Sequence, residues 1–331
     1  MLINEILNDA LYLDLDYPAQ MPVIQIQNKT IATAENFICL NGLPKSYKTT
    51  FMFKFIESAL SGNIVFDIKV NLKKTDTIIV VDTEQGKQEY YRQIKNLKKS
   101  LRINKLPDNF KSYLFRKYEP DVIIKSIYEL VDLNRPKLLF IDNLTELVFN
   151  PNDMIESKKV IQFLKTITAQ FNVVIVCLLH LGKQNLMSLG SLGSYADRGC
   201  QSSLKVVHDK ESNITTMEAT LMRSDLYFNP INITYDNDLK EFKQMDQIPK
   251  KENKRKFILM DLNDADHNNR IRIIFIKNDA IIYSELVEAI KGIYGVGTNI
   301  AKQQIIPYLV GNEFIETNKG IYKVNKNKNK N

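Results

Sequence analysis

The stretch ICLNGLPKSYKTTF, residues 38–51, predicts the fold around it. The apolar run 37–40 is typical of a buried strand, and Lys48-Thr49-Thr50 opens an apolar helix that is expected to end near Ser61-Gly62. The loop between them matches the phosphate-binding pattern G-x-x-x-x-G-K-[ST], except that Tyr47 stands where the second glycine is expected. Taken alone, this incomplete motif leaves open an ordinary basic loop before a helix.

The residue types of this loop suit a nucleotide triphosphate. Backbone N–H groups of the turn and the positive end of the helix dipole favour phosphate. Lys48 would place a positive charge on the β- and γ-phosphates, and the Thr49 hydroxyl would ligate Mg²⁺. ATP and Mg²⁺ are therefore the expected cofactors. The residues expected to bind the nucleotide are Gly42, Pro44, Lys45, Ser46, Tyr47, Lys48, Thr49 and Thr50.

Composition describes an ordinary globular protein. The chain has 331 residues, of which 44% are hydrophobic and 25% charged, and its net charge of +7 gives a mild preference for a polyanionic partner. Its three cysteines have no paired spacing, which speaks against a disulfide framework or a zinc site and favours a reducing cytoplasm. Because the first twenty residues contain no uninterrupted apolar run, neither a signal peptide nor a membrane partner is expected.

Apolar runs alternate with helical segments along the chain. Strands are expected at 23–26, 37–40, 77–81, 113–116, 137–141 and 173–179, and antiparallel strands at 205–207, 215–222 and 231–235. Helices are expected at 48–60, 87–101, 121–133 and 157–171. This alternation predicts an α/β protein with a parallel sheet covered on both faces. Since ligands bind at the carboxyl ends of such strands, the polar groups that follow four of them should meet at one edge.

Acidic side chains end two of these strands. Asp142 closes the run LLFID, the position expected to hold Mg²⁺ opposite Thr49. After the earlier strand, Glu84 is favoured over Asp82 as the carboxylate that orients, or takes a proton from, the water attacking the γ-phosphate. Ordinary loop caps are the competing interpretation of both acids.

Three basic side chains fit the same chemistry. His180 ends the 173–179 strand, where it would hydrogen-bond the γ-phosphate and signal its loss to the next loop. That loop, rich in glycine and serine, is expected to lie on the surface. Arg223 is the preferred positive charge supplied to the nucleotide of a neighbouring subunit, with Arg198 as the alternative. A structural histidine and a surface arginine remain the competing interpretations.

Five segments together resemble the RecA-like ATPases, and most of all the RepA/DnaB-type helicase branch carried by plasmids and mobile elements of low-GC bacteria. The segments are GLPKSYKTT, VVDTEQG, LLFIDNL, VIVCLLH and GSLGSYADRG. The resemblance covers residues 20 to 240, approximately, and implies a RecA-like, mainly parallel sheet flanked by helices. It assigns catalytic roles to Lys48, Glu84, His180 and Arg223, and metal binding to Thr49 and Asp142.

The resemblance also implies an assembly. Members of the family form rings, usually of six subunits, with single-stranded DNA in a central channel. The segment from Gly182 to Arg198, including Lys183, matches the part that faces this DNA. Tyr47 departs from the family pattern, which puts the geometry of the phosphate loop in question.

The C-terminal part of the sequence resembles a winged helix-turn-helix. Beyond the basic stretch PKKENKRK at 249–256, helices are expected near 258–262 and 270–277, followed by two more and a hairpin. The helix at 298–309 carries Lys302, Gln303 and Gln304, which would enter the major groove of duplex DNA. The predicted domains are an ATPase core at 1–248, a linker at 249–256, a winged helix at 257–324 and a disordered basic tail at 325–331.

The sequence therefore predicts a Mg²⁺-dependent ATPase acting as an oligomeric DNA helicase or translocase in replication or mobilisation of a plasmid or mobile element. One alternative is a DNA-binding regulator that uses ATP as a switch and hydrolyses it slowly. Another is a degenerate ATPase serving as a scaffold, against which Lys48, Thr49, Glu84 and Asp142 argue.

Overall fold

A computed structural model describes residues 19–182, 190–245, 262–276, 278–318 and 320–325. The chain divides into two compact units, residues 1–247 and 248–331. The predicted linker 249–256 and all but the first residue of the predicted tail lie outside the described residues.

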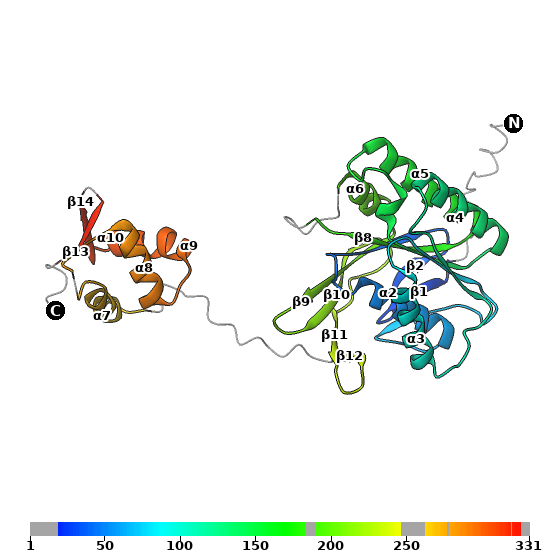
Figure 1. The fold of residues 1–331 in the computed structure, drawn as a ribbon, viewed down its shortest axis with the longest axis horizontal. Coiled ribbons are helices and arrows are strands. Elements are labelled where there is room, and N and C mark those ends of the chain that lie inside the picture. Colours follow the sequence, from blue (N-terminus) through cyan, green and yellow to red (C-terminus); the bar gives the residue numbers. More distant parts are fainter. Residues whose placement is uncertain (1–18, 183–189, 246–261, 277, 319, 326–331) are drawn as a thin grey trace. The chain divides into compact units, whose positions relative to one another are not determined.

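A nine-stranded mixed sheet forms the centre of the first unit (Figure 1). Its strands are β3 (Phe37–Gly42), β5 (Ile78–Asp82), β6 (Phe110–Leu114), β7 (Leu138–Asp142), β8 (Val174–His180), β9 (Ser202–Asp209), β10 (Ile214–Met222), β11 (Ile231–Asp236) and β12 (Glu241–Met245). Their order is β12-β11-β10-β9-β3-β8-β7-β5-β6. The six strands from β9 to β6 run parallel, and β10, β11 and β12 add an antiparallel edge. The predicted α/β class is confirmed as a large mixed sheet flanked by helices.

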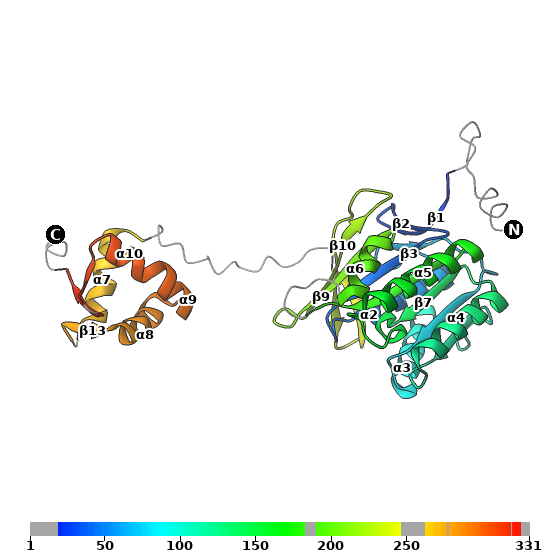
Figure 2. The ribbon, with the colours of Figure 1, turned by 90° about the horizontal axis from the view of Figure 1, so that it is seen from above.

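Helices cover both faces of this sheet (Figures 1 and 2). They are α2 (Lys48–Ser61), α3 (Lys87–Leu101), α4 (Pro120–Asn134), α5 (Met154–Phe171) and α6 (Gly190–Gly199). Apolar side chains of α2 and α3 share one core cluster, and those of α4, α5 and α6 share the other. Successive residues of β3 alternate between the two clusters, which explains why this strand is apolar throughout.

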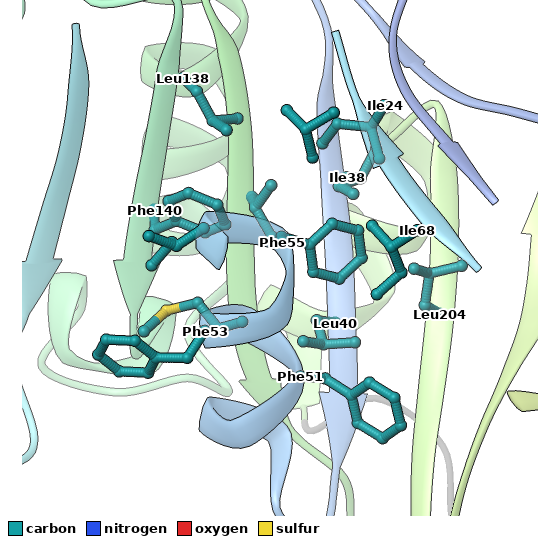
Figure 3. Packing of buried hydrophobic residues seen from close by; sticks show 14 of the residues in the cluster. Ile24, Ile38, Leu40, Phe51, Phe53, Phe55, Ile68, Leu138, Phe140 and Leu204 are labelled. Carbon is teal, nitrogen blue, oxygen red and sulfur yellow. The ribbon is translucent and has the colours of Figure 1, made fainter. Parts of the chain in front are cut away.

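The larger core lies between α2 and the strands (Figure 3). Phe51 and Phe55 of α2 are fully buried against Leu40 of β3 and Phe140 of β7. A small antiparallel sheet closes the same core; it consists of β1 (Pro22–Ile26), β2 (Lys29–Thr33) and β4 (Ile68–Val70). The sequence predicted β1 but neither β2 nor β4, whose runs are short and interrupted by polar residues.

Strand register brings the polar strand ends together. Gly42 at the end of β3 is paired with His180 at the end of β8, and Asp82 of β5 with Asp142 of β7. Because side chains alternate along a strand, Asp142 shares the face of Leu138 and Phe140, which is the face that α2 covers. Asp142 is thereby directed toward the first turn of α2.

Several predicted elements need correction. The segment after His180 was expected to be a surface loop, but 190–199 form α6, in which Leu192 and Ala196 are buried in the core cluster shared with α4 and α5. The strand expected at 113–116 lies at 110–114. β9 is parallel to β3, although antiparallel strands were expected from residue 205 onward. The edge strand β12, three of whose five residues are polar or charged, was missed.

The second unit is a small helical domain with a three-stranded sheet. Its elements are α7 (Asp264–Ile274), β13 (Ala280–Ile282), α8 (Tyr283–Tyr294), α9 (Thr298–Ile300), the π-helical turn η3 (Ala301–Ile305), α10 (Ile306–Gly311), β14 (Ile315–Asn318) and β15 (Ile321–Val324). The sheet order is β13-β15-β14, all antiparallel. The helix expected at 270–277 begins six residues earlier, at Asp264, where Asn263 caps it.

No helix within the described residues is long and apolar enough to cross a membrane.

Replacing Phe55 with alanine tests the packing of α2. Phe55 is fully buried, so the variant should lose about 3–5 kcal/mol of unfolding free energy, measured by urea denaturation of the ATP-free chain. The control is Leu133→Ala on α4, where the side chain is 81% exposed and a change within about 0.5 kcal/mol is expected. Equal losses in the two variants would contradict this description of the core.

Candidate functional site

Lys48 lies at the centre of the strand-end cluster. It is the first residue of α2 and is only 6% exposed. Its Nζ donates to the carbonyl oxygens of Gly42 at 2.9 Å and Leu43 at 3.0 Å, and lies 3.3 Å from Nδ1 of His180. Burial lowers the pKa of Lys48, and the nearby carboxylates Asp142 and Glu84 oppose that shift. The two carbonyl oxygens thus fix the ammonium group within the loop. A bound phosphate would take their place as its hydrogen-bond acceptor.

Thr49 and Asp142 form the second pair. The Thr49 hydroxyl donates to Oδ2 of Asp142 at 2.8 Å. Burial raises the pKa of Asp142 to about 7, and the neighbouring carboxyl of Asp82 adds to the shift, while the Thr49 hydrogen bond works against it. Two oxygen ligands from protein, completed by phosphates and water, are a usual set for Mg²⁺. These two side chains would hold the ion, and its charge would neutralise phosphate oxygens.

The structure separates the two acids that follow β5. Asp82 is fully buried, and its carboxylate accepts from the backbone N–H of Glu84 and Gln85 and from the Gln85 side chain at 2.7–3.0 Å. Burial raises the pKa of Asp82. Glu84 has a 47% exposed side chain and lies beside His180. Asp82 therefore shapes the turn, and Glu84 is the acid that faces the open side of the site.

His180 connects Lys48 to Glu84. An ammonium group can only donate, so Nδ1 of His180 accepts from Lys48, and the ring proton resides on Nε2. That proton is donated to Oε1 of Glu84, 3.3 Å away. The hydrogen bond from His180 holds the pKa of Glu84 below its usual value. Glu84 is thus ionised at neutral pH, as a group that accepts a proton from water must be.

The backbone of the phosphate loop is packed so closely at residue 42 that a side chain there would collide with its neighbours. A Cβ placed on Gly42 would lie 2.4 Å from Oγ of Ser46 and 2.7 Å from the carbonyl oxygen of Val206, so only glycine fits there. Ser46 is buried, and its hydroxyl has no hydrogen-bond partner among the described residues. A buried hydroxyl without a partner is costly, and a phosphate oxygen in the loop would satisfy it. These residues fit a bound nucleotide.

Tyr47 occupies the position of the missing glycine in a glycine-like conformation. Its φ of 67° lies in the left-handed region, which costs a non-glycine residue about 1–3 kcal/mol. Its ring makes edge-to-face contacts with two other rings. The distance between ring centroids is 4.8 Å to His208 of β9 and 5.1 Å to Phe242 of β12. Two such contacts contribute about 0.5–1.5 kcal/mol each, comparable to the backbone cost. The loop therefore keeps its turn and gains an anchor on the sheet.

The remaining loop residues are more open. Pro44 and Lys45 are exposed, Thr50 is half-buried, and Lys45 also has a positive φ, of 64°. A concave pocket with a volume of about 320 Å³ begins at Tyr47 and Thr50. It extends between α2, α3 and the β11–β12 hairpin. A base and ribose have space there beside the phosphate loop.

The two candidate arginines lie together, away from this cluster. Arg223 follows β10, and its guanidinium donates to the carbonyl oxygen of Arg198 on α6. Arg198 donates to Ser194 at 2.8 and 3.2 Å and lies over the ring of Tyr195. Within the described part of the chain neither arginine bonds to Lys48, Thr49 or Glu84. A role for either would have to be exerted on another subunit.

The predicted DNA contacts fall on different parts of the chain. Lys183 lies outside the described residues. Lys302 and Gln303 are exposed on the helical segment that follows Gly297, while Ala301 and Ile305 beside them are buried. The polar side chains of this segment thus face solvent, with Lys302 over the ring of Tyr283 at 6.0 Å.

Two residues that the sequence did not single out position the acids. The backbone N–H of Thr83 donates to the carbonyl oxygen of Asp142 at 2.6 Å, and its hydroxyl bonds the backbone of Asn143 at 2.8 and 3.1 Å. Gln85 binds both oxygens of Asp82. Their positions, one and three residues beyond the end of an apolar strand, were the available signal.

Comparisons with known proteins give a limited result. No protein-family model and no curated protein matches the sequence. Among solved structures, the chain is similar to a KaiC-like protein, PH0186, from Pyrococcus horikoshii OT3, at 13% identity over 64% of this chain and 90% of that one, with a TM-score of 0.47. It is also similar to the RadB recombinase, at 15% identity over 61% and 88%, with a TM-score of 0.45. Both similarities are weak, so the function proposed below rests on the site.

The raised pKa of Asp142 predicts a pH-dependent stability. Its pKa is about 7 in the folded protein, against an ordinary value of 3.8. The stability contributed by the protonated carboxyl is therefore fully present below about pH 4 and is lost as pH rises to about 7. Asp142→Asn should therefore stabilise the ligand-free protein relative to wild type increasingly across that window, by up to about 4 kcal/mol.

Thermal unfolding in EDTA between pH 5 and 8 measures this difference. The control is Asp121→Asn, an exposed carboxylate in the first turn of α4, whose effect should not grow over the window. A stability difference for Asp142→Asn that is the same at pH 5 and pH 8 would show that its pKa is not raised.

Proposed function

We propose that the chain is a Mg²⁺-dependent ATPase that works as an oligomeric DNA helicase or translocase. The observation that carries the proposal is the meeting of Lys48, Thr49, Glu84, Asp142 and His180 from α2 and three strand ends within hydrogen-bonding distance. These groups supply a cation for phosphate, oxygen ligands for a metal and an ionised carboxylate, which phosphoryl transfer to water requires. Replication or mobilisation of a plasmid or mobile element in the cytoplasm is the setting suggested by the sequence resemblance.

Each side chain has a part in the proposed hydrolysis. Lys48 exchanges its loop carbonyls for the β- and γ-phosphates. Glu84 orients the attacking water and receives its proton, and His180 fixes the direction of the Glu84 carboxylate. Arg223, or Arg198, completes the site of a neighbouring subunit, which makes the assembly, proposed as a hexameric ring, part of the mechanism.

The DNA-binding part of the proposal concerns two regions. Single-stranded DNA would pass the segment 182–198 in a central channel, contacting Lys183 and Arg198. The proposed winged-helix domain, 257–324, would bind duplex DNA. In its support, α8 and the helical segment 298–311 are followed by the hairpin β14–β15, and Lys302 and Gln303 are exposed on the second helical segment.

A slow, ATP-driven DNA-binding switch is the second candidate. The loop of this chain is anchored through Tyr47 to β9 and β12, and two of its residues have positive φ without being glycine. A loop held in this way favours long retention of nucleotide over rapid turnover. Such a switch would bind DNA with ATP but would not separate strands.

Steady-state ATP hydrolysis with and without single-stranded DNA tests the proposal. Wild type should be stimulated by DNA. Glu84→Gln should reduce the rate at least about 100-fold while leaving ATP binding intact, since it removes the proton acceptor but no phosphate contact. Lys48→Ala should lose both binding and hydrolysis.

The matched control is Glu129→Gln, an exposed residue of α4 that pairs with Lys125 and should keep the wild-type rate. Slow hydrolysis that DNA does not change, with ATP binding intact, would reject the motor in favour of the switch. Full activity in Glu84→Gln would reject the assigned carboxylate.

A further inference from the structure

Positive charge is concentrated in one short segment of the first unit. Residues 87–105, KQEYYRQIKNLKKSLRINK, contain seven basic residues and a single acid, Glu89, whereas the whole chain has a net charge of +7. The segment comprises α3 and the turn that follows it. Apart from Arg92 and Lys99, which line the concave pocket beside the phosphate loop, these residues take no part in the proposed ATPase site. The basic residues are Lys87, Arg92, Lys95, Lys98, Lys99, Arg102 and Lys105.

The helix arranges part of this charge as a stripe. Each residue advances the helix by about 100°, so Lys87, Tyr91, Lys95 and Lys98 fall within an arc of about 80°. Arg102, the C-cap residue, follows the last turn of α3. We call these five residues the α3 stripe. The residues that α3 packs against the core, such as Tyr90 and Leu97, lie on a neighbouring arc and fix the stripe at the surface of the unit.

The stripe is available for a partner. Lys87, Lys95 and Arg102 are exposed, and within the described part of the chain their side chains make no hydrogen bond or ion pair. Lys98 donates to the Asn104 carbonyl oxygen and keeps two further N–H groups. Tyr91 is 59% exposed in the middle of the stripe. α3 itself lies on the outside of the unit (Figures 1 and 2).

The other two cations of α3 are held by an acid or by another element of the fold, whereas Lys98 of the stripe bonds to the carbonyl oxygen of Asn104 in the turn after the helix. Arg92 pairs with Glu89 at 3.2 Å, and Lys99 donates to the carbonyl oxygen of Leu239 at 3.1 Å. The Lys99 contact joins α3 to the β11–β12 hairpin, and the Arg92 pair lies within α3. Among the described residues the cations of the stripe therefore have no acidic partner. The cations on the neighbouring face of α3, Arg92 and Lys99, are engaged in contacts within the fold.

The mixture of residue types identifies the ligand class. From Lys87 to Arg102 the stripe is about 22 Å long, enough for several successive phosphates. Cations that follow a phosphate backbone, combined with an aromatic ring open to stacking, are what proteins use for single-stranded nucleic acid. An acidic protein segment would match the charge but would leave the Tyr91 ring without a stacking partner. We propose that the α3 stripe binds single-stranded nucleic acid, with its cations on the phosphates and Tyr91 stacked on a base.

This surface is separate from the channel segment and the winged helix of the proposed function, and its binding does not require ATP. The first unit would thereby bind a nucleic-acid strand through a second surface. The stripe begins at Lys87, three residues after Glu84, so a bound strand would lie beside the turn that carries the proposed catalytic carboxylate.

Fluorescence anisotropy of a labelled 20-nucleotide oligo(dT), with the full chain and no ATP, tests the charge of the stripe. The variant is Lys87→Gln, Lys95→Gln, Lys98→Gln. Its affinity should fall at least about tenfold at 100 mM salt, and the slope of log K against log salt should decrease by about two, because three phosphate contacts are lost.

The control removes the same charge elsewhere. Lys125→Gln, Lys137→Gln, Lys210→Gln takes three exposed lysines from α4, the start of β7 and the β9–β10 turn, and should change affinity less than about twofold. Both variants should unfold at the wild-type temperature. Equal losses in the two variants, or wild-type affinity in the stripe variant, would overturn the proposal; the second result would leave an acidic protein as the better partner.

Tyr91 gives an independent readout. Tyr91→Ala should weaken oligonucleotide binding at least about fivefold without changing the salt slope, since stacking involves no counterion release. Tyr91→Phe keeps the ring and should bind as wild type does. Wild-type affinity in Tyr91→Ala would overturn the stacking that distinguishes nucleic acid from other polyanions.

Discussion

The parallel pairing of β3 with β8 and of β5 with β7 is the constraint on which the site depends. It places Gly42 beside His180 and Asp82 beside Asp142, so residues far apart in the sequence reach one edge. A shift of one residue in either pair would turn every side chain of a strand to the other face. The two core clusters prevent that shift, because each strand buries alternate residues in each of them.

Much of this arrangement could be predicted from the sequence. The continuously apolar strands and the helices between them are long and uninterrupted, and α3 was predicted with its observed bounds. β2, β4 and β12 were missed because their pairing depends on neighbouring strands more than on their own residues. α6 was predicted as a loop, since three glycines and two serines in ten residues disfavour a helix. The burial of Leu192 and Ala196 stabilises it.

The candidate site was predicted in part. That polar groups at the strand ends would meet follows from sheet geometry, and the structure has them in contact. The sequence did not reveal the separate role of each side chain. His180 lies between Lys48 and Glu84, and Asp82 is turned inward, where it accepts hydrogen bonds from its own loop. These distinctions depend on side-chain direction within one or two residues of a strand end. The motif specifies glycine at position 47, so it could not predict that Tyr47 would adopt the left-handed conformation.

Isothermal titration of ATP into the protein, with Mg²⁺ and with EDTA, tests the central claim most directly. One site per chain is predicted, with affinity at least about tenfold weaker in EDTA and in Thr49→Val, since both remove the metal that Thr49 and Asp142 would hold. Thr317→Val, at an exposed residue of β14 in the second unit, should bind within about threefold of wild type, because it lies outside the phosphate loop. Absence of binding to wild type in Mg²⁺, or binding that Mg²⁺ and Thr49→Val leave unchanged, would contradict the assignment of this edge of the sheet as a nucleotide site.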